Sequence, residues 1–476
     1  MVLNVLVILD KLVIFVCHNF KTIIFMRLKY ILFAALALGV AYSSQAQNER
    51  KNEDGSAYTV IANPGEKADS QVRINWHVDA DKRKENYIYL VSDGVVNMYY
   101  NGDLKKNYCT YTKRSDTKWK KAKKIRARAE FCTAFDSLYS KKANGENFYE
   151  DAVFMRYKVE LKGLEPDTEY MYRVGAGKGG QIRYFKTAPS SGAWSAAIIS
   201  DFHSYTPLPK RLEAAMGMIG TLEKCNGGDF DIVLHVGDIC AWGGSYSFWR
   251  SMYSEPYFSK YLWAGVNGNH DNMDRTSSRL SNDYFRYVNN NPDNGYDGEE
   301  GVCYHFTYGN ALFIMLNSES MRSAEGLAAA QAWVRDVIKS NPAKYVVVME
   351  HYQWFFGESG RTSQYGRWKD LFDECGVDLA IGANNHIYAR TNAIYQGRET
   401  DGSKGTVYIQ TPSSDNERGQ GLKEWTDNKD LIKFRWTEGG STVGAILLRA
   451  DDSKLHLTLY DRNGNALDSV SVAAKR

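Results

Sequence analysis

The sequence predicts a small all-β domain followed by a larger layered α/β domain, because the spacing of apolar residues changes partway along the chain. Between about residues 57 and 187, apolar and polar residues alternate, as in 72–78 and 155–161. This alternation is typical of strands with one buried face. After residues 188–193, short and wholly apolar runs alternate with helical patterns. Such runs suit strands buried on both faces, and their alternation with helices indicates an α/β domain.

The elements of the second domain follow in chain order. Apolar strands are predicted at 196–200, 231–236, 262–266, 311–316, 345–349 and 377–381. Helical spacing predicts helices at 212–225, 327–340 and 365–375, and alternating strands return between 442 and 472. We therefore expect a β-sandwich domain at 47–189 and an α/β domain with a C-terminal β segment at 190–476.

The N-terminus has the form of a secretory signal peptide. A basic start at Met26, an apolar run at 30–41 and the cleavage pattern Ser44-Gln-Ala46 lie within the first 46 residues of the 476-residue chain. The apolar run is shorter than the roughly 20 residues that a membrane span needs. We expect residues 1–46 to be a signal peptide with a misassigned upstream start, and the mature chain to be exported, periplasmic or extracellular, without a stable membrane span. A retained anchor is the alternative.

A polar insertion is expected at 101–147, between strands of the first domain. Its run 113–128 is rich in lysine and arginine and includes Trp119. One interpretation is a solvated basic face, and the other is a patch that attracts an anionic polymer. The net charge of +3 adds no general argument for nucleic acid binding. Cys109 and Cys132 both lie in this insertion and could pair in an oxidising compartment.

Side chains that bind metals or move protons follow five of the apolar strands. They are Asp201 and His203, then Asp238, then Asn269, His270 and Asp271, then His351, and finally His386. In α/β sheets, functional groups gather beyond the carboxyl ends of the strands. One such strand end could be a coincidence, but five indicate a common site. We interpret the other histidines of the mature chain as structural: His77, His235, His305 and His456.

These motifs resemble, in order and spacing, those of the calcineurin-like metallophosphoesterases. The motifs are Asp201-Phe-His203, Val236-Gly-Asp238, Gly268-Asn-His-Asp271, residues 346–351 and residues 386–390. The preceding β domain, with its segment 164–174, resembles that of the purple acid phosphatase branch. The resemblance implies a four-layer α-β-β-α sandwich preceded by a fibronectin III-like domain.

The resemblance also implies a site with two divalent metal ions, Zn, Mn or Fe. The first ion would be held by Asp201, His203, Asp238 and His386, and the second by Asp238, Asn269, His351 and Asn384. His270 would be the general acid and Asp271 would orient its ring. The implied reaction is hydrolysis of a small phosphate monoester by a metal-bound hydroxide.

Two positions depart from the family pattern. Ala241 stands where the purple enzymes have an iron-binding tyrosine, so we expect a colourless site. Asn384 stands where the family's last motif has its first histidine, and an amide oxygen is a poorer zinc ligand than imidazole. We therefore expect the second ion to be held more weakly. The alternatives are a phosphodiesterase with the same site, or a catalytically weakened relative that binds an anionic ligand.

Overall fold

The computed structural model describes residues 6–9, 12–15, 57–80, 87–92, 95–102, 105–141, 147–175, 180–273, 283–355, 363–422 and 428–475. The chain divides into two units, Met1–Ser56 and Ala57–Arg476. In the first unit, β1 (Leu6–Leu9) and β2 (Leu12–Phe15) form an antiparallel hairpin. The expected cleavage region at 26–46 lies outside the described residues. Within the described ranges, no helix has the length and apolar character needed to cross a membrane.

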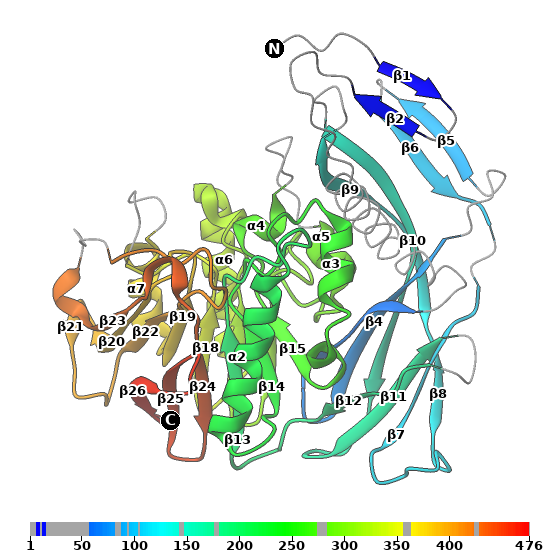
Figure 1. The fold of residues 1–476 in the computed structure, drawn as a ribbon. Helices are drawn as coiled ribbons and strands as arrows, with labels where there is room; N and C mark the ends of the chain where they lie inside the picture. The colour runs from blue at the N-terminus through cyan, green and yellow to red at the C-terminus, as the bar shows by residue number, and fades with distance from the viewer. Residues whose placement is uncertain are drawn as a thin grey trace. The chain divides into compact units, whose positions relative to one another are not determined.

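Two four-stranded sheets begin the second unit (Figure 1). One has the order β3 (Tyr58–Pro64), β4 (Gln71–Asp79), β10 (Asn147–Lys162) and β9 (Arg128–Lys141). The other has the order β12 (Arg183–Lys186), β11 (Glu169–Gly175), β7 (Tyr108–Lys113) and β8 (Lys123–Arg126), and β5 (Tyr87–Ser92) pairs separately with β6 (Val95–Tyr100). Trp76 and Tyr172, one from each four-stranded sheet, are buried in the same apolar core. The all-β region is confirmed, and its fibronectin III-like character stays a prediction.

Residues 101–147 belong largely to these sheets, since they supply β7, β8 and β9. The sequence pattern suggested an insertion because the side chains of β8 are mostly exposed and cationic. The turn before β8 is also basic, and there Arg173 lies over the Trp119 ring, 4.5 Å from its centroid. Binding of an anionic polymer to this exposed basic face stays a prediction.

The expected pair of Cys109 and Cys132 does not form. Cys109 lies in β7 and Cys132 in β9, which belong to different sheets, and the two side chains are buried in different apolar clusters. All six cysteines of the described ranges are free thiols. The two cysteines share one polar stretch of the sequence, but the strands that carry them belong to different sheets.

The α/β part contains two further sheets (Figure 1). The first has the order β15 (Leu262–Gly265), β14 (Ile232–His235), β13 (Trp194–Ile199), β24 (Gly444–Ala450), β25 (Lys454–Asp461) and β26 (Ala466–Ala473). The second has the order β16 (Tyr304–Tyr308), β17 (Ala311–Met315), β18 (Tyr345–Met349), β19 (Leu379–Gly382), β22 (Thr406–Gln410), β20 (Tyr388–Tyr395) and β21 (Arg398–Glu399). β23 (Ile432–Trp436) pairs with β20 on its other side.

Successive side chains of the buried strands point to opposite faces of their sheet, and the two sheets with the helices outside them form four layers. Ala196 of β13 and Val347 of β18 belong to one core between the sheets. Ala197 packs in a second core with α2 (Lys210–Asn226) and α3 (Tyr246–Met252), and Val348 packs in a third core with α6 (Ala324–Ser340) and α7 (Tyr365–Cys375). Both faces of each strand are thus covered, and the predicted four-layer sandwich is confirmed.

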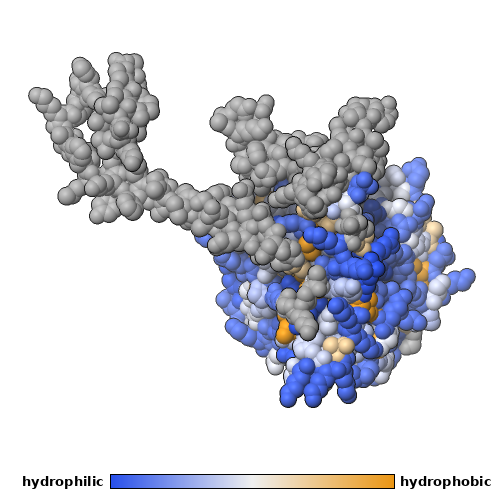
Figure 2. Space-filling view, turned by 90° about the vertical axis from the view of Figure 1, so that its right-hand side faces the viewer, coloured by the Kyte–Doolittle hydropathy of each residue, from blue (hydrophilic) through white to orange (hydrophobic). Residues whose placement is uncertain are grey.

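The helices predicted at 212–225, 327–340 and 365–375 correspond to α2, α6 and α7. The shorter helices are α4 (Asn269–Asn272), α5 (Asp283–Val288), η2 (Pro256–Ser259), η3 (Ser320–Arg322), η4 (Lys429–Leu431) and η5 (Gly439–Ser441). The face in Figure 2 is mostly hydrophilic where its residues are coloured. Among the large apolar side chains of the described ranges, only Ile182, Leu208 and Leu422 are exposed.

His77 joins the β domain to the α/β part and is structural, as expected. Its Nδ1 lies 2.5 Å from the Tyr246 hydroxyl, and its Nε2 lies 2.7 Å from the Tyr287 carbonyl oxygen. The side chain is fully buried, and burial lowers its pKa from 6.5 to about 3. The folded protein therefore holds this imidazole neutral at a pH where the unfolded chain protonates it.

We expect this buried histidine to make the protein less stable in acid. Between pH 6.5 and about 3, the unfolded chain binds a proton at His77 that the folded chain does not, so the free energy of unfolding falls as pH falls through this window. Urea unfolding across that range should show a shallower pH dependence in His77→Gln than in the parent protein. Equal slopes would show that His77 does not contribute.

Candidate metal centre

The predicted ligands lie at the ends of strands that are parallel neighbours. β13, β14 and β15 run parallel in the first sheet, and β18 and β19 run parallel in the second. Parallel neighbours end at the same edge, so the residues that follow them meet there. Three groups have ligand atoms within 4.8 Å of one another: Asp201, His203 and His386; His203, Asp238 and His270; and Asp201, Asp238 and His351.

The turns that carry these side chains have unusual backbone conformations. Five predicted ligands have positive φ: Asp201 at 51°, His203 at 43°, Asp238 at 49°, Asn384 at 70° and His386 at 59°. Non-glycine residues rarely adopt this left-handed region, and each instance costs on the order of 1–3 kcal/mol. Such strain persists where the surrounding structure imposes it, and it clusters at functional sites.

Asp238 occupies the centre of the group. Its Oδ2 lies 3.2 Å from His203 Nε2 and 3.3 Å from His351 Nε2. Its Oδ1 accepts a hydrogen bond of 2.8 Å from the backbone N–H of His270. The carboxylate thus lies between the two expected ligand sets, where a bridging ligand has to be.

Backbone carbonyls orient two of the imidazoles. Nδ1 of His351 donates to the Val236 carbonyl oxygen at 2.7 Å, and Nδ1 of His203 donates to the Asp201 carbonyl oxygen at 2.9 Å. Each Nε2 then faces Asp238 Oδ2, and His351 Nε2 also lies 3.2 Å from Asn269 Oδ1. When these rings are deprotonated, the same Nε2 atoms are the ones free to bind a metal ion. This is how ligating histidines are usually fixed.

The site contains two buried carboxylates, which suit cations. Asp201 and Asp238 are almost wholly buried, and Asp201 Oδ1 accepts no hydrogen bond from the described residues. Burial raises the pKa of Asp201 to about 6. Burial works against protonation of His351, but the Asp238 and Asp201 carboxylates outweigh it and raise its pKa to about 10. Buried carboxylates need a compensating charge, and this set of carboxylate, imidazole and amide donors fits divalent metal ions.

Glycine is required where two turns touch. An added Cβ on Gly268 would lie 2.1 Å from Asp238 Oδ1, and one on Gly237 would lie 2.6 Å from His351 Nδ1. Real Cβ atoms do not approach this closely, so either side chain would displace a predicted ligand.

Gly268→Ala is therefore expected to weaken metal binding and to destabilise the protein by about 1–3 kcal/mol, the usual result of overpacking. Gly366→Ala is the matched control, because a Cβ at that position of α7 meets nothing within 4 Å. Thermal unfolding and metal analysis would distinguish the two variants. Equal metal content in both variants would show that the Asp238 carboxylate can move without loss of bound metal.

His270 lies beside the group with its ring fixed by the backbone. Nδ1 donates to the Ala241 carbonyl oxygen at 2.8 Å, which leaves Nε2 as the outward nitrogen. Burial, with added repulsion from His203 and Arg418, lowers its pKa to about 4 although Asp238 opposes the shift. The two Asp271 carboxylate oxygens accept instead from the N–H groups of Cys240 and Gly268, each at 2.8 Å. Asp271 thus links the turn at Cys240 to the turn at Gly268. The His270 ring is oriented by the Ala241 carbonyl and not, as the sequence had suggested, by Asp271.

Asn384 is held by a buried glutamine. Its Nδ2 donates to Gln353 Oε1 at 2.7 Å, and its backbone N–H donates to Asp201 Oδ2 at 3.3 Å. The first bond engages the amide nitrogen, so Oδ1 is the side-chain atom that remains for coordination. The asparagine that stands in place of the family's histidine is thus oriented by its hydrogen bond to Gln353.

Two residues that sequence reasoning missed lie in the segment after β22. Asp415 Oδ2 is 3.6 Å from His203 Nδ1, and Arg418 Nη2 is 3.5 Å from His270 Nε2. The composition of the polar stretch 413–421 suits either a rim over the site or an ordinary surface loop, and neither residue follows a strand end directly. No signal in the sequence singles them out.

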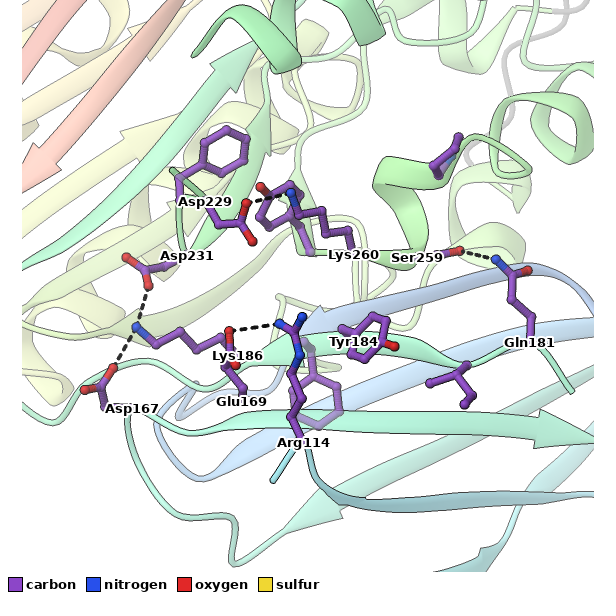
Figure 3. A pocket seen from close by; sticks show the side chains of 15 residues that line it. Arg114, Asp167, Glu169, Gln181, Tyr184, Lys186, Asp229, Asp231, Ser259 and Lys260 are labelled. Carbon is purple, nitrogen blue, oxygen red and sulfur yellow. Dashed lines mark hydrogen bonds and ion pairs between the residues drawn. The ribbon is translucent and has the colours of Figure 1, made fainter. Parts of the chain in front are cut away.

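A cavity of about 580 Å³ elsewhere in this unit has a different character (Figure 3). Its cations are paired with carboxylates: Arg114 with Glu169, Lys186 with Asp167 and Asp231, and Lys260 with Asp229. Asp231 and Lys260 precede β14 and β15, whereas the predicted ligands follow these strands. Because its charges neutralise one another, this cavity offers no free charge for a phosphate.

Comparisons with known proteins agree with this geometry. Residues 195–388 match the family model described as calcineurin-like phosphoesterase. Acid phosphatase type 7 of Mus musculus is 27% identical over 302 residues, which cover 54% of this chain and 64% of that protein. The human protein of the same name, from Homo sapiens, is 25% identical over 283 residues, which cover 53% and 60%. The matches thus span less than two thirds of the length of these relatives.

A solved structure shares the fold over most of the chain. The purple acid phosphatase PPD1 from yellow lupin (Lupinus luteus) seeds superimposes with a TM-score of 0.63 at 17% identity, over 88% of this chain and 74% of that one. Together with the family match, this confirms the resemblance seen in the motifs. Residues 195–388 therefore form a calcineurin-like phosphoesterase domain, in a chain that has a purple acid phosphatase-like fold.

Proposed function

We propose that the protein is a metal-dependent phosphoesterase that hydrolyses small phosphate monoesters, with His270 as the general acid. The observation that carries the proposal is the position of Asp238 between His203 and His351, with Oδ2 at 3.2 and 3.3 Å from their Nε2 atoms. A carboxylate so placed can serve two ions. Asp201, His203 and His386 would complete one set, and Asn269, His351 and Asn384 the other.

Two divalent ions, when bound, would neutralise charge on the phosphoryl oxygens and favour attack by water. The protein's own contribution concerns the leaving group. Because Ala241 fixes the ring through Nδ1, Nε2 of His270 is the atom that would give a proton to the departing oxygen. Burial lowers the pKa of His270 to about 4, so the ring would carry that proton in acid. Trp242, with its ring centroid 5.5 Å from that of His270, limits the orientations of the imidazole further.

Hydrolysis of p-nitrophenyl phosphate and bis-p-nitrophenyl phosphate, across several metals, tests the proposal. The parent protein should hydrolyse the monoester faster than both His270→Ala and Asp238→Asn. Faster hydrolysis of the diester would support the phosphodiesterase alternative. Turnover of neither substrate above the variants would leave the ligand-binding alternative.

We also propose that the protein is exported. The support is the basic start at Met26, the apolar run and the Ser44-Gln-Ala46 pattern. N-terminal sequencing of protein from the native cell should find Gln47 as the first residue.

Asn384→His is expected to raise the affinity for the second ion, because imidazole is a better ligand than an amide for zinc. The parent protein should accordingly hold one ion tightly and lose the other on dialysis. Competition with a coloured chelator would measure both affinities. Gln353 contacts Asn384 directly, so the double change with Gln353→Ala gives the new ring room. Unchanged affinity in both variants would show that residue 384 does not contact the metals.

A further inference from the structure

We propose that Arg418 binds a non-esterified phosphoryl oxygen of the substrate and thereby selects phosphate monoesters over diesters. The proposal rests on the function proposed above and names a specificity determinant of the same site. It begins from position: Nη2 of Arg418 lies 3.5 Å from Nε2 of His270, the atom proposed to protonate the leaving oxygen. A phosphoryl group within reach of that nitrogen is also within reach of the guanidinium.

The backbone that carries Arg418 is firmly anchored to the site. Oδ1 of Asp415 accepts the N–H groups of Glu417 and Arg418, both at 2.8 Å, while its Oδ2 faces His203. Glu417 pairs with Arg211 of α2 at 3.0 Å. Gly419 packs so closely that an added Cβ would lie 1.8 Å from the Gly439 carbonyl oxygen. The arginine is therefore presented to His270 by a segment with fixed contacts on three sides.

The positive charge of the Arg418 guanidinium is also available to an anionic ligand. Within the described ranges, its side chain has one hydrogen bond, the long one to His270, and no carboxylate lies within ion-pair distance. The cations in the cavity of Figure 3, in contrast, are each paired with an aspartate or a glutamate. A half-buried arginine without an anionic partner, beside a candidate phosphate site, has the character of an anion ligand.

The chemistry of the two ester classes explains the selectivity. A monoester has three non-bridging oxygens and carries up to two negative charges, whereas a diester has two and carries one. The third oxygen of a monoester is replaced by an ester group in the diester. An arginine aimed at that position gains an ion pair with the first substrate and meets a bulky neutral group in the second.

The test compares kcat/KM for p-nitrophenyl phosphate and for bis-p-nitrophenyl phosphate in the parent, Arg418→Met and Arg418→Lys. In Arg418→Met, the ratio of monoester to diester should fall about 10- to 100-fold, the usual effect of losing a charge-assisted hydrogen bond. Arg418→Lys, which keeps the charge but not the forked geometry, should recover part of the ratio. Arg398→Met removes the same charge from the exposed edge strand β21 and should leave the ratio unchanged.

Calorimetric binding of inorganic phosphate provides a second measurement that does not depend on turnover. Arg418→Met should bind phosphate about tenfold more weakly at unchanged metal content, as a lost ion pair predicts. An equal loss on both substrates, or unaltered phosphate binding, would overturn the role of Arg418. If the parent protein hydrolyses neither ester, the proposed function fails, and phosphate binding alone decides whether Arg418 contacts the anion.

Discussion

His270→Gln is expected to lower kcat for an alkyl phosphate by about 10²- to 10⁴-fold, the range typical of a lost general acid. The loss on p-nitrophenyl phosphate should be smaller, because p-nitrophenolate departs without a proton. The geometry supports this difference, since the Ala241 carbonyl engages Nδ1 and leaves Nε2 to act. Steady-state kinetics with both substrates would measure it, and metal analysis should find the same metal content as in the parent.

A matched control for this prediction is His456→Gln. His456 lies in β25, where its Nδ1 is 2.9 Å from the Ser471 hydroxyl, and it belongs to none of the converging groups. This variant should retain full activity on both substrates. If His270→Gln lowered both rates by the same factor, His270 would act through structure or binding rather than by protonating the leaving oxygen.

Asp238→Asn is expected to have the largest effect, with loss of both ions and a fall in activity of at least about 10³-fold, because metal ions supply several kcal/mol of the catalysis. Its carboxylate is the one ligand shared by the two expected sets, and its Oδ2 lies near both His203 and His351. The amide keeps the size of the side chain, so the hydrogen bond from the His270 N–H can survive. The variant should therefore keep the fold but lose metal binding and activity.

Metal analysis after gel filtration, together with circular dichroism, would measure both parts of this expectation. Asp336→Asn, on the exposed face of α6, is the control and should retain the metal content of the parent protein. An Asp238→Asn variant with the same metal content as the parent protein would refute the bridging position.

The strands, the helices and the convergence of side chains at the strand ends could be predicted because each follows from a local pattern. An apolar run ends at the first polar residues that follow it, so Asp201, Asp238 and Asn269 could be located without a structure. Parallel pairing then brings these ends together by a general rule. The fold class could be predicted for the same reason.

The parts that could not be predicted depend on long-range contacts. Asp415 and Arg418 reach the site through hydrogen bonds and packing of a polar segment, and nothing in their local pattern differs from an ordinary loop. The pairing expected for Cys109 and Cys132 was wrong because β7 and β9 belong to different sheets. Asp271 was expected to contact His270, but a side chain adjacent in sequence turned toward Cys240 and Gly268 instead.

The division of the ligands between the two sheets has a mechanical consequence. Asp201, Asp238 and Asn269 follow strands of the first sheet, and His351 and His386 follow strands of the second. Each expected ligand set thus draws on both halves of the sandwich. An ion held by such a set would connect the two sheets, so we expect metal binding to stabilise the whole α/β part against unfolding.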